Sequence, residues 1–161
     1  MTRIPFASPE IAQFWRYMSG SLDRLVELAA SLDDEALSWR PPAEETNSIG
    51  ALTVHTLGNA EENILEILAG HAVHRDRDSE FAGGSMAPHE LVERWQILRP
   101  QLEAALAALP AAELDRAREH ARRGAIFGRE ALIITGRHAA EHLGQAELTR
   151  DLWMASKLGR A

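Results

Sequence analysis

Apolar residues recur at intervals of three and four along most of this chain, and that spacing narrowly limits what it can fold into. Between positions 9 and 32 the residues with this spacing are Ile11, Phe14, Trp15, Met18, Leu22, Leu25, Val26 and Leu32. A period near 3.6 places them on one face of an α-helix. Ser8 is a suitable N-cap and Pro9 a suitable first residue. We therefore expect a first helix that starts near Pro9.

The same periodicity predicts three more long helices. The second runs from about Ser48 to Ala69, with Thr46 or Asn47 as its cap and Gly70 as its stop. The third begins near Pro88, is capped by Ser85 or a neighbour, and ends at Leu109-Pro110. Pro100 lies inside the third helix and should kink it or split it in two. The fourth covers 131–150 and ends near Trp153.

The connecting segments are polar or rich in helix breakers. Residues 33–42 interrupt the first helix, and Pro41 and Pro42 exclude helix there. Residues 71–86 form a polar loop with a Gly-Gly pair. Residues 111–128 are ambiguous and fit a short helix followed by a loop; we find no β-hairpin signal. The expected fold is one all-α domain over 1–161, a four-helix bundle with a long crossover.

Composition excludes several functional classes. The chain has no cysteine, so disulfides, cysteine nucleophiles and thiolate zinc sites are ruled out. Its net charge of −7 argues against a nucleic-acid partner, because phosphate binding needs a basic surface. The basic cluster Arg116, Arg118, Arg122 and Arg123 is interleaved with acidic residues and is interpreted as a solvated segment. No apolar run approaches a membrane span and no signal peptide precedes the first helix, so we expect a cytoplasmic protein.

Two histidines one helical turn apart are the first candidate for chemistry. His138 and His142 lie on one face of the fourth predicted helix and can converge on one metal ion. His55, on the second predicted helix, can complete a three-histidine site with an open position, as in catalytic metal centres. Histidines on wet helix faces are the alternative interpretation.

The helix faces give mixed support. Gln145 shares the stripe of His138 and His142, and small residues flank that stripe, which favours a cleft. His55 shares a stripe with Asn59 and Glu62, roughly opposite the main apolar stripe, so periodicity alone favours an exposed His55. The remaining histidines are interpreted as surface residues: His71, His74, His89 and His120.

Three motifs, in segments 47–59, 75–81 and 138–145, together resemble those of the DinB/YfiT-like superfamily of four-helix-bundle proteins. The segment 47–50 leading into 55–59 (NSIG…HTLGN) is similar to that family's NSI…HLxGN helix start. Residues 75–81 (RDRDSEF) resemble the RDRDxEF loop of a subgroup of unknown function. Residues 138–145 (HAAEHLGQ) are similar to the HxxxHxGQ motif. Together the motifs span positions 47–145.

The resemblance implies a metal triad of His55, His138 and His142, binding nickel, zinc, iron or manganese. Characterised relatives include thiol-dependent transferases and isomerases that activate a low-molecular-weight thiol, so a thiol cosubstrate and a small-molecule substrate are implied. A homodimer is implied as well, and Trp15 or Trp95 could supply its interface. Because an open metal position could take water in place of a thiol, the expected enzyme is of the thiol-dependent transferase type or the hydrolase type.

Further roles are assigned to residues near the triad. Glu62 is the candidate general base. Candidates for contacts with the ligands or the substrate are Asn59, Glu141, Gln145, Arg75 and Arg77, with the two arginines recognising an anion or tying the crossover down. Two rival hypotheses remain open: a non-catalytic metal-binding or stress-associated bundle, and a helical interaction module without metal.

Overall fold

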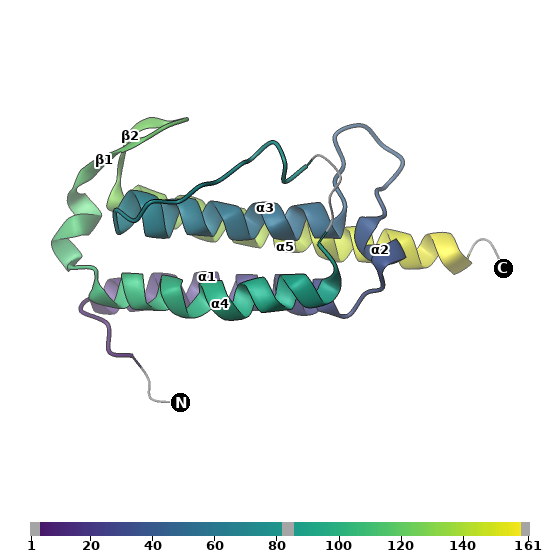
Figure 1. The fold of residues 1–161 in the computed structure, drawn as a ribbon, viewed down its shortest axis with the longest axis horizontal. Helices are drawn as coiled ribbons and strands as arrows, with labels where there is room; N and C mark the ends of the chain where they lie inside the picture. The colour runs from purple at the N-terminus through teal and green to yellow at the C-terminus, as the bar shows by residue number, and fades with distance from the viewer. Residues whose placement is uncertain (1–3, 82–85, 159–161) are drawn as a thin grey trace.

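The computed structural model describes residues 4–81 and 86–158, and four long helical rods form its frame (Figure 1). They are α1 (Pro9–Ala30), α3 (Ile49–Glu61) with its continuation η1 (Glu62–Leu68), α4 (Pro88–Ala108) and α5 (Gly128–Leu158). Helix α1 packs on both α4 and α5, and α3 packs on α5. The predicted four-helix bundle is confirmed, with segment 71–81 crossing over α3 before α4 begins.

Helix starts follow the expected capping chemistry with two differences. The Ser8 side chain accepts a hydrogen bond from the backbone N–H of Ile11, as predicted. Helix α3 is capped by Ser48 and not by the two residues before it, because the Ser48 hydroxyl accepts from Ala51 N–H at 3.2 Å. Ser85, the expected cap of α4, lies outside the described residues. The N-cap of α4 is Ala87, whose N–H donates to the Glu90 carboxylate.

The second rod changes its winding partway along. Residues Glu62–Leu68 form a π-helix, and the N–H of Ala69 donates to the carbonyl of Ile64, five residues back. Such segments are rare in proteins, and those that occur often lie at functional sites. The fourth rod is longer than predicted, since α5 runs from Gly128 to Leu158. Pro100 does not split α4, which stays one helix with Pro100 at an exposed position.

Four short elements fill the connections: α2 (Asp34–Ser38), the 3-10 helix η2 (Ala111–Asp115), β1 (Ala117–His120) and β2 (Gly124–Phe127). The strands pair antiparallel, from Ala117 opposite Phe127 to His120 opposite Gly124. The expectation of no hairpin was wrong. Each strand has only four residues, most of them exposed, and so lacks an alternating apolar pattern. Gly124 has φ +71°, a left-handed conformation that suits the end of the turn.

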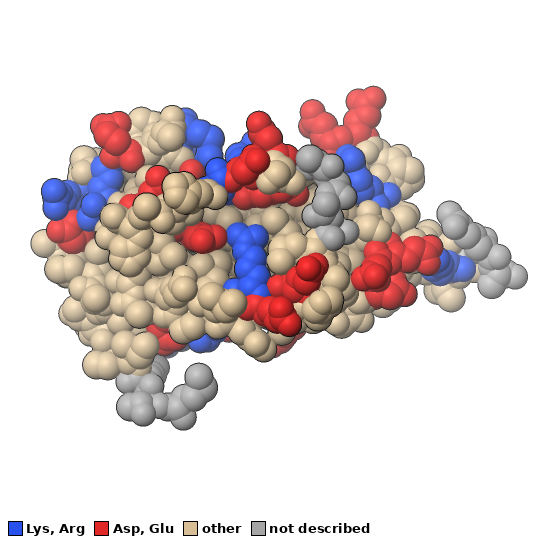
Figure 2. Space-filling model, viewed as in Figure 1, with Lys and Arg blue, Asp and Glu red and all other residues tan. Residues whose placement is uncertain are grey.

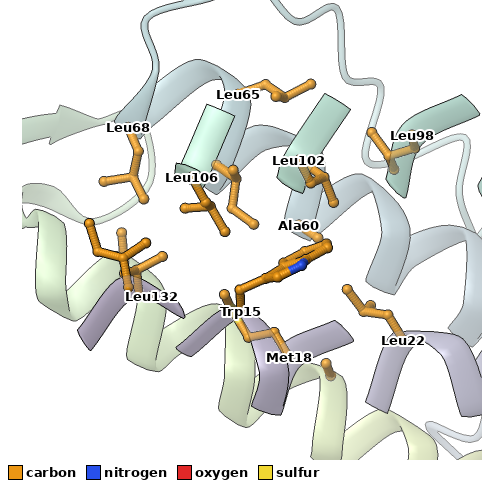
Figure 3. Close-up of a cluster of buried hydrophobic side chains, with 14 of the residues drawn as sticks. Trp15, Met18, Leu22, Ala60, Leu65, Leu68, Leu98, Leu102, Leu106 and Leu132 are labelled. Atoms are coloured by element: carbon orange, nitrogen blue, oxygen red, sulfur yellow. The ribbon is translucent and has the colours of Figure 1, made fainter. Parts of the chain in front are cut away.

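The core lies between the four rods. Figure 3 shows Trp15, Met18 and Leu22 of α1 pointing toward leucines of α4 and α5 and toward Ala60. Trp15 and Trp95 are both buried, with 5% and 6% of their surface exposed. Their burial contradicts the idea that these tryptophans supply a dimer interface. Trp95 instead donates its indole N–H to Asp23 at 2.8 Å. Homodimerisation itself stays a prediction.

The outer surface mixes charges of both signs. Figure 2 shows acidic and basic side chains interspersed on the face formed by α3 and α4, with uncharged surface between them. Within residues 4–81 and 86–158, no helix has both the length and the apolarity needed to cross a membrane.

Candidate metal centre

Three imidazoles from two antiparallel rods meet between α3 and α5. The ring centroids of His138 and His142 lie 4.2 Å apart, and the ring of His55 lies 4.9 and 5.3 Å from them. One nitrogen from each ring lies within 4.8 Å of the others. Three nitrogens at this separation can serve one ion, since metal–nitrogen bonds are about 2 Å long.

His55 is buried, with 5% of its surface exposed, so the periodicity argument for an exposed His55 was wrong. The face opposite the core is covered by the crossover segment. The ring of Phe81 packs on the His55 ring with centroids 4.5 Å apart. The guanidinium carbon of Arg77 lies over the Phe81 ring, 5.4 Å from its centroid. The helical periodicity of α3 identifies the face that packs on the core, but it does not show that a loop covers the opposite face.

The imidazoles of α5 are held in the form that binds metal. Burial lowers the pKa of His138 to about 3, and the charges of His142, His55, Arg75 and Arg123 act in the same direction. Burial also lowers the pKa of His142, against a hydrogen bond from its own Nδ1 to Gln145 that raises it. Both rings are therefore neutral at pH 7, and a neutral imidazole nitrogen has the lone pair that a metal requires.

The Nε2 atom of His138 tests whether the site fits a metal. This atom is buried and has no hydrogen-bond partner among residues 4–81 and 86–158. A buried polar atom without a partner costs about 1–3 kcal/mol. Coordination of an ion would satisfy it, so the donor set and its burial fit a divalent metal. Three imidazole ligands suit zinc, nickel, iron or manganese without selecting among them.

The outer nitrogens of two rings are already bonded. His55 Nδ1 lies 2.7 Å from Glu80 Oε2, and His142 Nδ1 lies 2.6 Å from Gln145 Oε1. Because both oxygens only accept, the Nδ1 atoms donate, which leaves Nε2 of each ring for the ion. A carboxylate or amide on the outer nitrogen fixes the ring's orientation and raises its basicity.

A buried ion-pair network supports Glu80. The Arg75 guanidinium donates to both Glu80 oxygens at 2.7 and 2.8 Å, and to the carbonyl of His55 at 3.2 Å. It also donates to Glu62 Oε2 at 2.6 Å. Arg75, Glu62 and Glu80 side chains are each less than a tenth exposed. Arg75 therefore ties the crossover segment to α3 and η1, as one of its two predicted roles required.

Glu62 is bound by two guanidiniums. Arg122, in the turn between β1 and β2, donates to the same Glu62 oxygen at 2.5 Å. Burial alone would raise the pKa of Glu62, but the hydrogen bonds and charges of Arg122 and Arg75 outweigh it and hold the pKa below its ordinary value. A carboxylate with a low pKa is a weak proton acceptor near neutral pH. The general-base role of Glu62 stays a prediction that this geometry does not favour.

The hairpin is docked and not merely solvated. His120 has 2% of its surface exposed, which contradicts its assignment as a surface residue. Its Nδ1 accepts from the N–H of Arg122 at 3.2 Å, and burial lowers its pKa. Arg118 pairs with Glu113. The basic segment is thus partly integrated into the fold, while Arg116 and Arg123 remain exposed.

The other predicted contact residues differ in their surroundings. Asn59 is buried one turn from His55, and its Oδ1 has no partner within the described part of the chain. Gln145 contacts His142 directly. Glu141 is exposed and pairs with Arg137 at 3.4 Å. Glu80 was not singled out from the sequence, although its signal was present: a ligating histidine needs an acceptor for its second nitrogen, and Glu80 lies in the quoted RDRDSEF motif.

A four-helix bundle with three histidines gathered between two of its rods defines the class of this protein: a helical bundle with a candidate metal site. The chain belongs to the DinB superfamily, whose family model matches residues 17–146. It is also similar to a crystal structure described as a conserved protein from Enterococcus faecalis. That similarity has a TM-score of 0.68 at 17% identity and covers 89% of this chain and 96% of the other, so it shows a common fold. No curated protein matches the chain.

Proposed function

We infer that this protein is a metal-dependent enzyme that binds one divalent ion through His55, His138 and His142. The observation that carries the inference is the convergence of three imidazoles within 4.8 Å, one with a buried nitrogen that has no partner among residues 4–81 and 86–158. A divalent ion held there would lower the pKa of a bound thiol or water and so supply a nucleophile.

The chain's own residues support such a role by fixing the ligands. Glu80 orients His55, Gln145 orients His142, and Arg75 holds Glu80 in place. Phe81 excludes water from the outer side of the His55 ring. Because the chain has no cysteine, a thiol nucleophile would have to come from a cosubstrate. We therefore propose a thiol-dependent transferase, with water activation and hydrolysis as the second reaction type.

A non-catalytic metal site is the rival function, and the ligand count distinguishes the two. Structural sites are closed by four protein ligands, whereas catalytic sites keep a position open. Among residues 4–81 and 86–158 the cluster consists of three histidines, and the nearest carboxylate, Glu80, is bonded to an outer nitrogen. This arrangement favours the enzyme.

The first test is metal content. Untagged parent protein and a His138→Ala variant should be analysed by elemental mass spectrometry after exposure to nickel, zinc, iron and manganese in turn. We expect about one ion per chain in the parent and none in the variant. His89→Ala, at an exposed position of α4, is the control and should keep the ion. A parent that takes up no metal would refute the proposal.

The second test separates catalysis from storage. The metal-loaded parent is assayed for transfer of a low-molecular-weight thiol to an electrophile such as a chlorinated nitrobenzene, and for hydrolysis of an activated ester. Turnover that is lost in His138→Ala and kept in His89→Ala supports an enzyme. Stoichiometric metal without either reaction across several thiols favours the non-catalytic bundle.

A further inference from the structure

The turn between β1 and β2 carries two exposed arginines, Arg122 and Arg123, whose guanidinium groups can still bind a ligand. Arg122 uses one terminal nitrogen to bind Glu62, and 43% of its side chain remains exposed. Arg123 is exposed and forms no ion pair with any residue in 4–81 or 86–158. Guanidiniums bind carboxylates and phosphates in paired hydrogen bonds, so this turn can accept an anion.

The turn is fixed before any ligand arrives. The N–H of Arg122 donates to His120 Nδ1 at 3.2 Å, and the N–H of Arg123 donates to the His120 carbonyl at 3.0 Å. His120 is itself buried against η1. A rigid turn loses little conformational freedom on binding, which strengthens the contact it can make.

A short series of contacts connects this turn to the triad. Arg122 and Arg75 bind the same oxygen of Glu62 at 2.5 and 2.6 Å, and Arg75 reaches the His55 carbonyl at 3.2 Å. Figure 1 shows the hairpin and the crossover segment on the same side of the bundle, over α3 and α5.

The charges around the turn leave Arg123 as its available cation. Glu62 and Glu80 pair with Arg75 and Arg122, and Glu66 also acts on His120, so the cluster has no excess of positive charge. Arg75, proposed from the sequence to recognise an anion, is buried and engaged by acceptors of the protein. The exposed guanidinium of Arg123 is therefore the group of this cluster that can attract an anion.

We propose that Arg122 and Arg123 form a subsite for the carboxylate of an anionic cosubstrate, one that places its reactive group at the three histidines. The inference deepens the proposed function and rests on it for the second half of that statement. Arg123 supplies the free guanidinium. Arg122 binds Glu62 through one terminal nitrogen, which holds the turn in place, and offers its other guanidinium nitrogens to the ligand.

The test compares two thiols on cobalt-loaded protein, followed by the thiolate-to-cobalt absorption band. Mercaptosuccinate has a thiol and two carboxylates, whereas 2-mercaptoethanol has a thiol and no charge. We expect Arg123→Gln to weaken mercaptosuccinate roughly fivefold at low salt and to leave 2-mercaptoethanol unchanged. Arg123→Lys should keep most of the affinity. Arg116→Gln is the matched control, an exposed arginine just before β1 that forms an ion pair with Glu113.

A metal-free arm makes the inference independent of cobalt uptake. Succinate is titrated into apoprotein and followed by the amide resonances of residues 120–124. Succinate binding that Arg123→Gln weakens and Arg116→Gln does not would support the subsite, even for a protein that takes up no cobalt and so lacks the proposed function. If Arg123→Gln and Arg116→Gln changed binding equally in either experiment, the subsite would be overturned. The proposed function would still stand as long as the thiols bound to the cobalt.

Discussion

His55 Nδ1 and Glu80 Oε2 lie 2.7 Å apart although 25 positions separate them in the chain. His55 belongs to α3, whereas Glu80 belongs to the crossover segment that follows η1. The bond makes the crossover part of the site, because it fixes the ring that α3 contributes. Burial would raise the pKa of Glu80, yet its bonds to His55 and Arg75 and their charges hold that pKa below its ordinary value. Glu80 is thus an anion at neutral pH.

Removing that charge should weaken the metal. In Glu80→Gln, His55 loses its carboxylate partner, and we expect the affinity for zinc to fall by about 10–100-fold. The measurement is a competitive titration against a chromophoric chelator. Asp78→Asn, which removes an exposed charge from the same segment, should bind zinc like the parent. Equal affinities for parent and Glu80→Gln would show that the bond does not support the ligand.

The metal-free protein should tolerate the loss of His138. In His138→Leu a similar volume is kept, and the Nε2 atom that has no partner among the described residues is removed. We therefore expect the free energy of unfolding to stay equal or rise by about 1 kcal/mol. Urea unfolding in the presence of a chelator measures it. The parent should gain stability on adding zinc, whereas this variant should not. A loss above about 2 kcal/mol without metal would contradict this account, and His74→Leu, in the exposed loop, serves as control.

Acid should destabilise the metal-free protein through its neutral histidines. The pKa of His138 is about 3 in the folded chain, against 6.5 for an ordinary histidine. Between these values the unfolded chain binds the proton and the folded chain does not, so stability falls as pH falls below 6.5. Between pH 6.5 and 4.5 the loss from His138 alone approaches roughly 2 kcal/mol.

The matching variant is His138→Gln, which cannot take up that proton. We expect its unfolding free energy to change less over the same pH range, with the residual slope arising from His142 and His120, whose pKa values burial also lowers. Chemical unfolding at half-unit pH steps in the presence of a chelator provides the curves. Parallel curves for parent and variant would mean that His138 is protonated in the folded protein.

Gly58 should be intolerant of a side chain despite its place in the middle of α3. A Cβ atom there would overlap Glu80 Oε1 and touch Arg75 Nε at 3.0 Å. We expect Gly58→Ala to destabilise the protein by about 1–3 kcal/mol and to weaken metal binding by displacing Glu80. Gly144→Ala on α5 meets nothing within 4 Å and should stabilise by about 0.5–1 kcal/mol. Similar effects of the two changes in urea unfolding would refute a close approach at Gly58.

The sequence predicted the bundle because each long rod buries one apolar face, and the apolar residues of that face recur every three or four positions in the sequence. It also placed His138 and His142 one turn apart on α5. Its errors came from contacts that no local pattern records. His55 is buried by Phe81 and Glu80, which belong to a polar loop. The periodicity of α3 does not record this loop, so His55 was predicted to lie on an exposed face.

The hairpin was missed for a related reason. Its strands are short and mostly exposed, and its register depends on docking His120 against η1 and on bonding Arg122 to Glu62. The π-helical winding of Glu62–Leu68 was equally invisible, since it inserts no distinctive residue. The burial of His55, the docked hairpin and the π segment all lie around Glu62, and the sequence was least informative about this region.

The π segment of the second rod has a consequence for alignment with relatives. A π turn accommodates one residue more than an α turn, so the segment Glu62–Leu68 can hold an extra residue without changing the faces of the helix on either side of it. His55 faces α5 before this segment, and Leu65 and Leu68 within it still enter the core. Loss of a single residue within 62–68 would let the segment wind as an ordinary α-helix. A relative that lacks one residue here would therefore keep both its histidine and the face that it presents to the hairpin.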